Sequence, residues 1–261
     1  MSGHASDAAF ALAGVDYRIG SIDILSGITL EVKYGRVLAL VGPNGAGKSS
    51  LLSLLTRDAR PAAGSIELDG RPVHDYSARE LSRRRAVLLQ SNQVAFSFTA
   101  REVVEMGRAP WTGLDHGNDE TAIREALVRA DVLHLADRAF SSLSGGEKAR
   151  VSLARVLAQD TAIIMLDEPT AALDLRHQED VLQLTRRLAA LGRAVIVVLH
   201  DLSLAAAYAD DVAIISEGRL NALGAPDEIF TEDRISDVYG ISVRVIADPE
   251  TGRPVVLPRR A

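Results

Sequence analysis

Residues 42–49 read Gly-Pro-Asn-Gly-Ala-Gly-Lys-Ser and fit the phosphate-binding loop pattern G-x-x-x-x-G-K-[ST]. In such a loop successive backbone N–H groups surround an anion, and Lys48 would reach the β- and γ-phosphates of a nucleotide. The hydroxyl of Ser49 would bind Mg²⁺. An apolar run, residues 37–41, precedes the loop, and leucines at helical spacing follow it. The order of strand, glycine loop and helix predicts a nucleoside triphosphate site.

Two carboxylates, Asp167 and Glu168, end a second apolar run at residues 162–166. Acids at the end of a buried strand are costly unless they have partners or a task. Beside a phosphate-binding loop, Asp167 would hold the Mg²⁺ shell, and Glu168 could take a proton from an attacking water or orient it. A solvated strand end is the alternative.

Polar residues follow two other expected strands, at Gln90 and at His200. Ligands of open α/β sheets bind at the carboxyl ends of the strands, so both positions are candidates for the same site. Ser144, Gly145 and Gly146 open a helix whose first N–H groups could form a second anion cradle. An ordinary capped helix and a structural histidine remain the alternatives.

The elements that must position these groups follow from periodicity. Strands are expected at residues 8–19, 28–32, 37–41, 65–69, 86–89, 162–166, 195–199 and 212–223, the last as a hairpin-like pair. Capping boxes are expected at Ser77 with Glu80 and at Thr99 with Glu102, and the second is expected to open a helix over residues 99–108. Residues 171–174 are expected to start the next helix. No strand is expected from 98 to 141, which indicates a helical lobe, about 93–158, inserted into an α/β core. Residues 243–261 are expected to form a terminal hairpin.

The 261 residues carry a net charge of −6 and no cysteine. The absence of a basic excess argues against a nucleic-acid partner. The absence of cysteine excludes disulfides and Cys-ligated metal and suits a reducing compartment. No signal peptide and no segment of about 18 continuous apolar residues is expected.

The motifs follow one another along the chain in a fixed order: the phosphate-binding loop, Gln90, the helical insert, Leu-Ser-Gly-Gly-Glu at 143–147, the carboxylates Asp167 and Glu168, Ala-Leu-Asp at 172–174, and His200. Together they resemble the ATP-binding subunit of ABC transporters over about residues 9–242. The resemblance implies an α/β P-loop NTPase: a RecA-like core with a mainly parallel sheet, an antiparallel β subdomain and the inserted helical lobe.

The resemblance also implies roles for single residues. Glu168 would be the general base, His200 would contact the γ-phosphate, Gln90 would touch Mg²⁺ and the attacking water, and Asp174 would link two sites. Tyr17, which from the sequence alone could equally pack at a strand end, would stack on adenine. ATP would lie on Tyr17, Gly42, Pro43, Asn44, Gly45, Ala46, Gly47, Lys48, Ser49 and Ser50 of one copy and on Ser144, Gly145 and Gly146 of a second. Mg²⁺ would be held by Ser49, Gln90 and Asp167.

The implied partners are a second copy of the chain in an ATP-sandwich homodimer, two transmembrane permease subunits and, indirectly, an extracytoplasmic substrate-binding protein. The implied location is the cytoplasmic face of the cell membrane. An uncharged patch with Phe96, Phe98 and Trp111 could receive the permease, or could simply pack within the helical lobe.

Two stretches narrow the resemblance to importers. Residues 103–108, Val-Val-Glu-Met-Gly-Arg, are similar to importers of iron chelates, haem and cobalamin, and residues 243–254 are most similar to haemin importer subunits. Lys148 and Ala149 replace the common Gln-Gln after the 143–147 motif, and Ser50 replaces a common Thr. Alternatives are an importer of siderophores or cobalamin, a non-transport ABC ATPase and a P-loop kinase for a metabolite.

Overall fold

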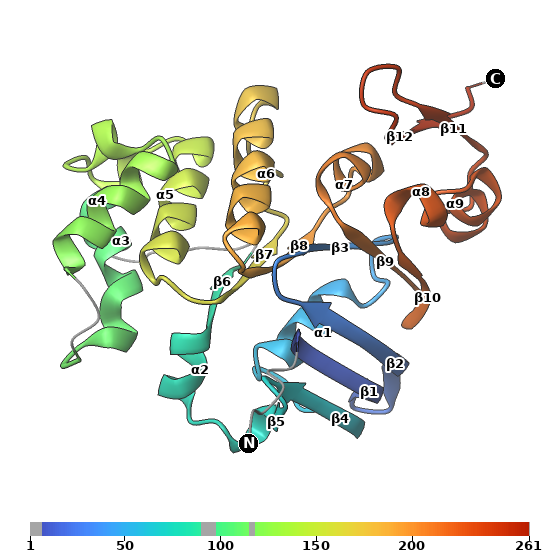
Figure 1. Ribbon diagram of the computed structural model, residues 1–261, viewed down its shortest axis with the longest axis horizontal. Coiled ribbons are helices and arrows are strands. Elements are labelled where there is room, and N and C mark those ends of the chain that lie inside the picture. The colour runs from blue at the N-terminus through green and yellow to red at the C-terminus, as the bar shows by residue number, and fades with distance from the viewer. Residues whose placement is uncertain (1–6, 90–97, 115–117, 261) are drawn as a thin grey trace. The chain divides into compact units, whose positions relative to one another are not determined.

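The computed structural model describes residues 7–89, 98–114 and 118–260 (Figure 1). The chain divides into two compact units, one made of Met1–Asp75 and Thr185–Ala261, the other of Tyr76–Leu184. Among the described residues, no helix combines the length and the apolar character needed to cross a bilayer.

The first unit contains a buried, mainly parallel group of strands. β3 (Val37–Val41) pairs in parallel with β8 (Ala194–Val198) and with β9 (Asp211–Ser216), and β9 pairs antiparallel with β10 (Arg219–Gly224). Every residue of β3 and β8 is buried, which is why both read as continuous apolar runs without alternation. The guanidinium of Arg36 binds both carboxylate oxygens of Asp211, at 2.6 and 2.9 Å, and so fixes the start of β3 to the start of β9.

An antiparallel sheet in the same unit has the order β2-β1-β4-β5. Its strands are β1 (Ala8–Ile19), β2 (Ile22–Lys33), β4 (Ala63–Leu68) and β5 (Arg71–Pro72). Along the second half of β2 exposed and buried side chains alternate, as in a sheet with one solvated face. The sequence predicted only residues 28–32 of this strand, because its first half is mostly exposed and lacks a continuous alternation.

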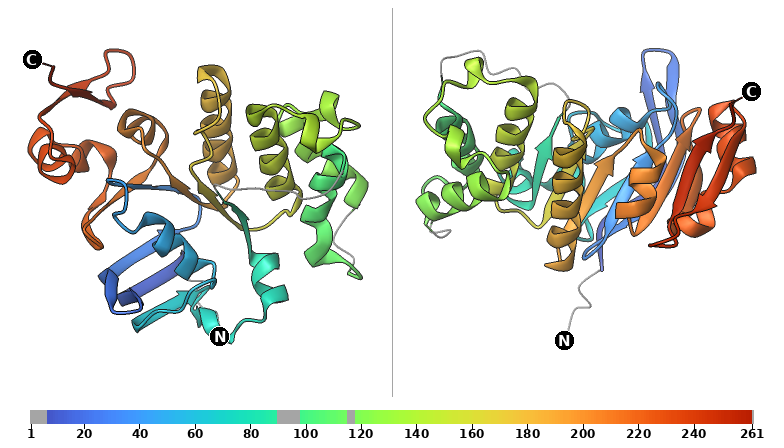
Figure 2. Two further views of the ribbon diagram at one scale, coloured as in Figure 1. Left: turned by 180° about the vertical axis from the view of Figure 1, so that it is seen from behind. Right: turned by 90° about the horizontal axis from the view of Figure 1, so that it is seen from above.

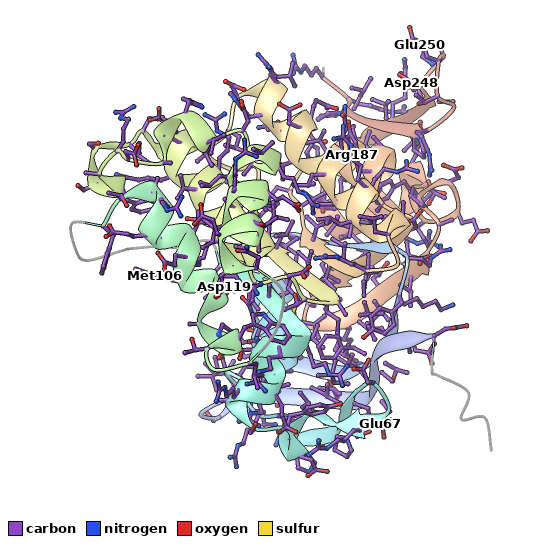
Figure 3. All side chains as sticks on the ribbon, turned by 60° about the vertical axis from the view of Figure 1, so that its left-hand side comes forward. Glu67, Met106, Asp119, Arg187, Asp248 and Glu250 are labelled. Carbon is purple, nitrogen blue, oxygen red and sulfur yellow. The ribbon has the colours of Figure 1, made fainter. Side chains whose placement is uncertain are left out.

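The remaining elements of the first unit are short. They are α1 (Lys48–Leu55), η1 (Val73–Asp75), α7 (Leu202–Tyr208), α8 (Pro226–Ile229), α9 (Glu232–Tyr239), β11 (Val243–Ala247) and β12 (Pro254–Pro258). β11 and β12 form an antiparallel hairpin beside α9 (Figure 1). Asp248 accepts hydrogen bonds from the backbone N–H groups of Glu250 and Thr251 in the turn, where Figure 3 labels Asp248 and Glu250.

The second unit is mainly helical. It contains α2 (Ala78–Arg84), β6 (Arg85–Leu88), α3 (Ala100–Glu105), η2 (Met106–Trp111), α4 (Asp119–Arg129), η3 (Leu133–Leu135), η4 (Phe140–Ser142), α5 (Gly145–Ala158), β7 (Ile163–Asp167) and the first part of α6 (Leu175–Ala190). β6 and β7 pair in parallel. Helices α3, α4 and α5 pack against one another and form one group in every view (Figure 2). The capping boxes expected at Ser77 and Thr99 are confirmed.

Two expected helices differ from the structure. Residues 99–108 were expected to form one helix, but α3 ends at Glu105 and a 3₁₀ turn follows, which brings Gly107 against the backbone of α5. The helix expected to start at residue 171 begins at Leu175, because the side chain of Asp174 accepts the N–H of His177 and thereby caps α6.

Candidate functional site

The phosphate-binding loop joins β3 to α1, and its glycines are required by contacts and backbone angles. Gly42 has φ 147°, and a Cβ there would lie 1.9 Å from the carbonyl oxygen of Ile215. Gly47 has φ 104°, and a Cβ there would lie 2.6 Å from the Leu25 side chain. Neither position accepts another residue without a shift of its neighbours, so the loop lies directly on β2 and β9.

The helix that follows the loop begins without a side-chain cap. Its N-cap is Gly47, and no acidic residue lies in its first turn, whereas α2, α3 and α5 each begin with a capping box. The ammonium of Lys48 donates hydrogen bonds to the carbonyls of Gly42, at 2.7 Å, and Pro43, at 2.9 Å. A helix N-terminus without a carboxylate, next to a buried lysine, is suited to bind an anionic phosphate.

The two predicted carboxylates lie at the end of β7 in the second unit. Asp167 is its last residue and is 7% exposed. Glu168 follows with φ 49°, in the left-handed region that residues other than glycine seldom adopt. Such backbone strain is concentrated at functional sites, where surrounding contacts maintain it. Both side chains line a pocket of about 220 Å³ together with Gly145, Lys148 and Ala149 of α5.

The loop between Glu168 and α6 is held by its own hydrogen bonds. The N–H of Ala171 donates to the carbonyl of Glu168, at 3.3 Å. The side-chain amide of Gln178 donates to the carbonyls of Thr170, at 3.3 Å, and Leu173, at 3.0 Å. Asp174 is exposed at the end of this loop. Hydrogen bonds from the backbone N–H and then the imidazole of His177 hold the pKa of the Asp174 carboxyl below its usual range.

Helix α5 begins at the predicted second cradle. Ser144 accepts the N–H of Glu147, at 3.3 Å, and Glu147 accepts the N–H of Ser144, at 2.7 Å, so this start is a capping box. Hydrogen bonds to the Glu147 carboxylate from the backbone N–H and then the hydroxyl of Ser144 hold the pKa of Glu147 below its usual range. In the part of the chain that the structure describes, no atom outside the start of α5 lies within 4 Å of a Cβ placed on Gly145, which leaves its backbone open toward those residues.

The predicted site residues divide between the two units. Tyr17, residues 42–50 and His200 belong to the first; Ser144, Gly145, Gly146, Asp167, Glu168 and Asp174 belong to the second. Gln90 lies outside the described residues, as does Phe96. Tyr17 is half-buried on β1 and is paired with Leu25 of β2. His200 is exposed; it follows β8 after Leu199 and directly precedes Asp201, the N-cap of α7.

The oxygen ligands available suit Mg²⁺. The described residues contain no group of three His, Cys, Asp or Glu side chains that could hold a metal ion by themselves. Mg²⁺ is usually bound by one or two protein oxygens together with substrate phosphates and water. The Ser49 hydroxyl and the buried Asp167 carboxylate are donors of this kind, so the residues present fit the ion.

The sequence did not indicate three features of the site. Arg150 of α5 contacts His177, which contacts Asp174. The hydroxyl of Tyr239, at the end of α9, is buried beside the backbone of Gly42, although its geometry is not that of a hydrogen bond. These contacts join residues distant in sequence and follow no local pattern; only the aspartate-to-histidine spacing of three could have been noticed.

The third feature is a pocket of about 410 Å³ on the helical lobe. It is lined by Phe98, Glu102, Glu105, Met106, Arg108, Ala109, Thr112 and Asp119. Figure 3 labels Met106 and Asp119. Of the predicted uncharged patch, Phe98 lines this pocket, whereas the indole N–H of Trp111 donates to the carbonyl of Gln159, at 2.7 Å, and its ring lies under the guanidinium of Arg83.

Comparisons with known proteins agree on one family. Residues 25–171 match the family model described as ABC transporter. A hemin import ATP-binding protein of Streptomyces coelicolor is 54% identical over 252 residues, which cover 96% of this chain and 90% of that protein. A solved structure described as an inward-facing conformation of a candidate metal-chelate type ABC transporter matches with a TM-score of 0.82 and 26% identity, over 97% of this chain and 98% of that one. A dimeric ATP-binding cassette in a post-hydrolysis state, with ADP and Pi bound, matches with a TM-score of 0.75 and 28% identity, over 83% and 98%.

Proposed function

Because this chain belongs to the ABC transporter family, we propose that it is the ATP-hydrolysing subunit of a membrane importer whose cargo is haemin. Its fold is that of an ABC ATPase, with parallel strands, an antiparallel sheet and a helical lobe. The observation that carries the cargo assignment is the 54% identity to a hemin import ATP-binding protein over 96% of this chain. An importer of siderophores or cobalamin is the alternative.

The phosphate-binding loop receives the phosphates of ATP. Lys48 turns from the carbonyls of Gly42 and Pro43 to the β- and γ-phosphates, and the uncapped N–H groups of α1 bind the remaining oxygens. Tyr17 stacks on the adenine. Ser49, Asp167 and Gln90 would hold Mg²⁺, which would neutralise charge on the phosphates when bound.

Hydrolysis uses residues that follow buried strands. Glu168 takes the proton of the attacking water. Its backbone, held at φ 49°, sets the direction in which the side chain leaves the chain. His200, exposed after β8, contacts the γ-phosphate. Gln90 orients the water and senses the position of the helical lobe. This division of roles is supported by the chemistry of each side chain and by the family to which the chain belongs.

Two copies complete each site. The phosphate-binding loop of one copy and residues Ser144, Gly145 and Gly146 of the other enclose one ATP, while Asp174 links the two sites. The open backbone at Gly145 supports this role, as does the dimeric form of a related cassette with ADP and Pi bound. Enclosing ATP between two copies excludes water and strengthens the electrostatic contacts around the phosphates.

The permease binds at the helical lobe. The pocket that Phe98 and Met106 line, with Glu102 and Glu105 around it and Asp119 paired with Arg108, suits an apolar segment with a basic end. Two permease subunits place the homodimer at the cytoplasmic face of the cell membrane, and an extracytoplasmic binding protein delivers the cargo to them.

Uptake by the complex tests this function. The chain is reconstituted with its co-purifying permease in proteoliposomes, and ATP-dependent accumulation of haemin, a ferric siderophore and cobalamin is compared. Haemin accumulation that Glu168→Gln abolishes supports the proposal. Preferential accumulation of another cargo contradicts the cargo, and purification with soluble partners alone supports a non-transport ABC ATPase instead.

A further inference from the structure

Arg150 on α5 and Asp174 in the loop before α6 are joined through the imidazole of His177 on α6. Arg150 Nη1 lies 2.5 Å from His177 Nε2, and His177 Nδ1 lies 2.7 Å from Asp174 Oδ1. The exposed fractions of the Arg150 and His177 side chains are 12% and 22%, so both are largely shielded from solvent. All three residues belong to the second unit.

The direction of these hydrogen bonds fixes the tautomer of His177. A guanidinium can only donate, so Nε2 of His177 must accept from Arg150. The proton of the neutral ring therefore resides on Nδ1, which donates to the Asp174 carboxylate. The backbone N–H of His177 donates to the same oxygen, at 3.0 Å. The chain of donors thus runs from a cation on α5 to an anion in the loop.

This link connects the two segments that the proposed function assigns to a second copy. The N-terminus of α5 carries Ser144 and Gly146, and the loop carries Asp174. A second contact lies one turn before Arg150, where a Cβ on Gly146 would be 3.3 Å from the carbonyl oxygen of Ala172. Two contacts therefore hold the loop against the first two turns of α5, one at Gly146 and one through Arg150 and His177.

We propose that His177 is a positioning residue that holds the Asp174 loop on α5, so that a second copy meets both segments as one preformed surface. This inference rests on the proposed function, because it concerns the surface that closes over ATP. A preformed surface loses less conformational entropy on association than two independent segments do. Without His177, the loop and α5 keep their own hydrogen bonds, but the loop is no longer fixed to α5 through Arg150, so the position of the loop relative to α5 has to be ordered when the dimer closes.

Dimer closure in a Glu168→Gln parent measures this effect. ATP is titrated into the parent and its variants, the dimer fraction is followed by sedimentation velocity, and ATP binding to the monomer is measured separately at a protein concentration too low for dimers. His177→Ala is expected to need roughly 10-fold more ATP for half-maximal dimerisation. Its monomer should bind ATP as the parent does, since the phosphate-binding loop lies in the other unit.

Two variants separate the link to α5 from the local cap. His177→Asn keeps a donor near the position of Nδ1, and so keeps the contact with Asp174, but does not reach Arg150. Arg150→Met removes the same link from the α5 side and retains an apolar stem. Both are expected to behave like His177→Ala. Arg176→Ala, a neighbour on α6 whose side chain is 82% exposed, is the matched control and should dimerise as the parent does.

The possible results are distinct. Parent-like dimerisation of His177→Ala, or of both His177→Asn and Arg150→Met, overturns the positioning role while the ATP sandwich stands. Equal losses in monomer ATP binding and in dimerisation overturn it too, because they indicate general damage to the fold. A parent that stays monomeric at saturating ATP overturns the proposed ATP sandwich, and this inference with it.

Discussion

The ammonium of Lys48 donates a hydrogen bond to the carbonyl oxygen of Gly42, 2.7 Å away. This bond crosses the phosphate-binding loop from near its end to its first residue. Lys48 is 6% exposed, and its side chain is directed over the loop. A positive charge held in this position, beside an uncapped helix N-terminus, makes the loop an anion site prepared by the fold.

Replacing Lys48 with alanine should therefore remove most of the affinity for ATP. Loss of one charge from a buried, hydrogen-bonded pair costs about 2–5 kcal/mol, so we expect Kd for ATP to rise on the order of 100-fold. Isothermal titration of the purified chain measures this directly. Lys33→Ala, at an exposed lysine of β2 in the same unit, is the control, and a Lys48→Ala variant with the affinity of that control would contradict the assignment.

Glu168→Gln should separate ATP binding from hydrolysis. Glutamine is nearly isosteric and is not branched at Cβ, so it should tolerate the φ of 49° at this position as glutamate does. It cannot accept the proton of water, and we expect kcat to fall by roughly 100-fold or more while ATP binding persists and a dimer accumulates. Phosphate release assays and size-exclusion chromatography with ATP report the two effects.

An exposed carboxylate in the second unit controls for the loss of charge. Glu125→Gln on α4, whose side chain is 57% exposed, should hydrolyse ATP at the wild-type rate. Wild-type turnover in Glu168→Gln would show that another group activates the water.

Gly107→Ala should destabilise the helical lobe. A Cβ at this position would lie 2.2 Å from the carbonyl oxygen of Arg155, and backbone of α5 cannot move aside as a side chain could. Overpacking of this kind costs about 1–3 kcal/mol, which chemical denaturation resolves. Val128→Ala, on the same lobe but 51% exposed, should change the free energy of unfolding by less than about 0.5 kcal/mol. Equal stability of the two variants would mean that η2 shifts freely on α5.

Local patterns predicted the framework of the molecule, because each rule acts over a few residues. The buried strand before Gly42, the capping boxes at Ser77 and Thr99, and the carboxylates at the end of β7 all follow from spacing and residue type. The break after Glu105 did not follow, because it depends on how closely Gly107 approaches α5.

The contacts around the site were harder to predict for the same reason. Arg150 and His177 are 27 residues apart, and Tyr239 reaches the phosphate-binding loop from α9. Neither contact corresponds to a periodic pattern of residues in the sequence. Packing between distant segments decides them, so they emerge only once the chain is folded.

Tyr239→Phe should change how stability depends on pH. Burial raises the pKa of the Tyr239 hydroxyl from 10.0 to about 12, and the nearby Gly42 amide opposes part of the rise. Since the folded-state pKa is the higher one, this contribution is complete below pH 10.0 and is lost as the pH rises through about 12. Because the ring is only partly shielded from solvent, we expect a loss of at most about 2 kcal/mol.

Urea denaturation at pH 8 and pH 11 compares the two proteins. At pH 8 the phenylalanine variant should be at least as stable as the wild type, because the hydroxyl is buried without a hydrogen bond of normal geometry. Between the two pH values it should lose less stability than the wild type. If the stability of the two proteins depended on pH identically, the pKa of Tyr239 would be the same in the folded and the unfolded chain, and the prediction would be wrong.

Phe98→Asp should uncouple ATP hydrolysis from transport. Phe98 lines the pocket on the helical lobe, where Glu102 and Glu105 supply negative charge and Asp119 pairs with Arg108. A further carboxylate in place of the aromatic ring removes apolar contact area and adds an unpaired charge to the surface that we assign to the permease, so affinity for the permease should fall at least 10-fold. The isolated chain should keep its basal ATPase rate, because neither the phosphate-binding loop nor Glu168 contributes to this pocket.

Haemin uptake in proteoliposomes and basal phosphate release are measured together, with Val128→Asp on α4 as the control for added charge. Loss of uptake in Phe98→Asp alone, with basal hydrolysis intact in both variants, is the expected result; full uptake in Phe98→Asp would assign permease binding to another surface.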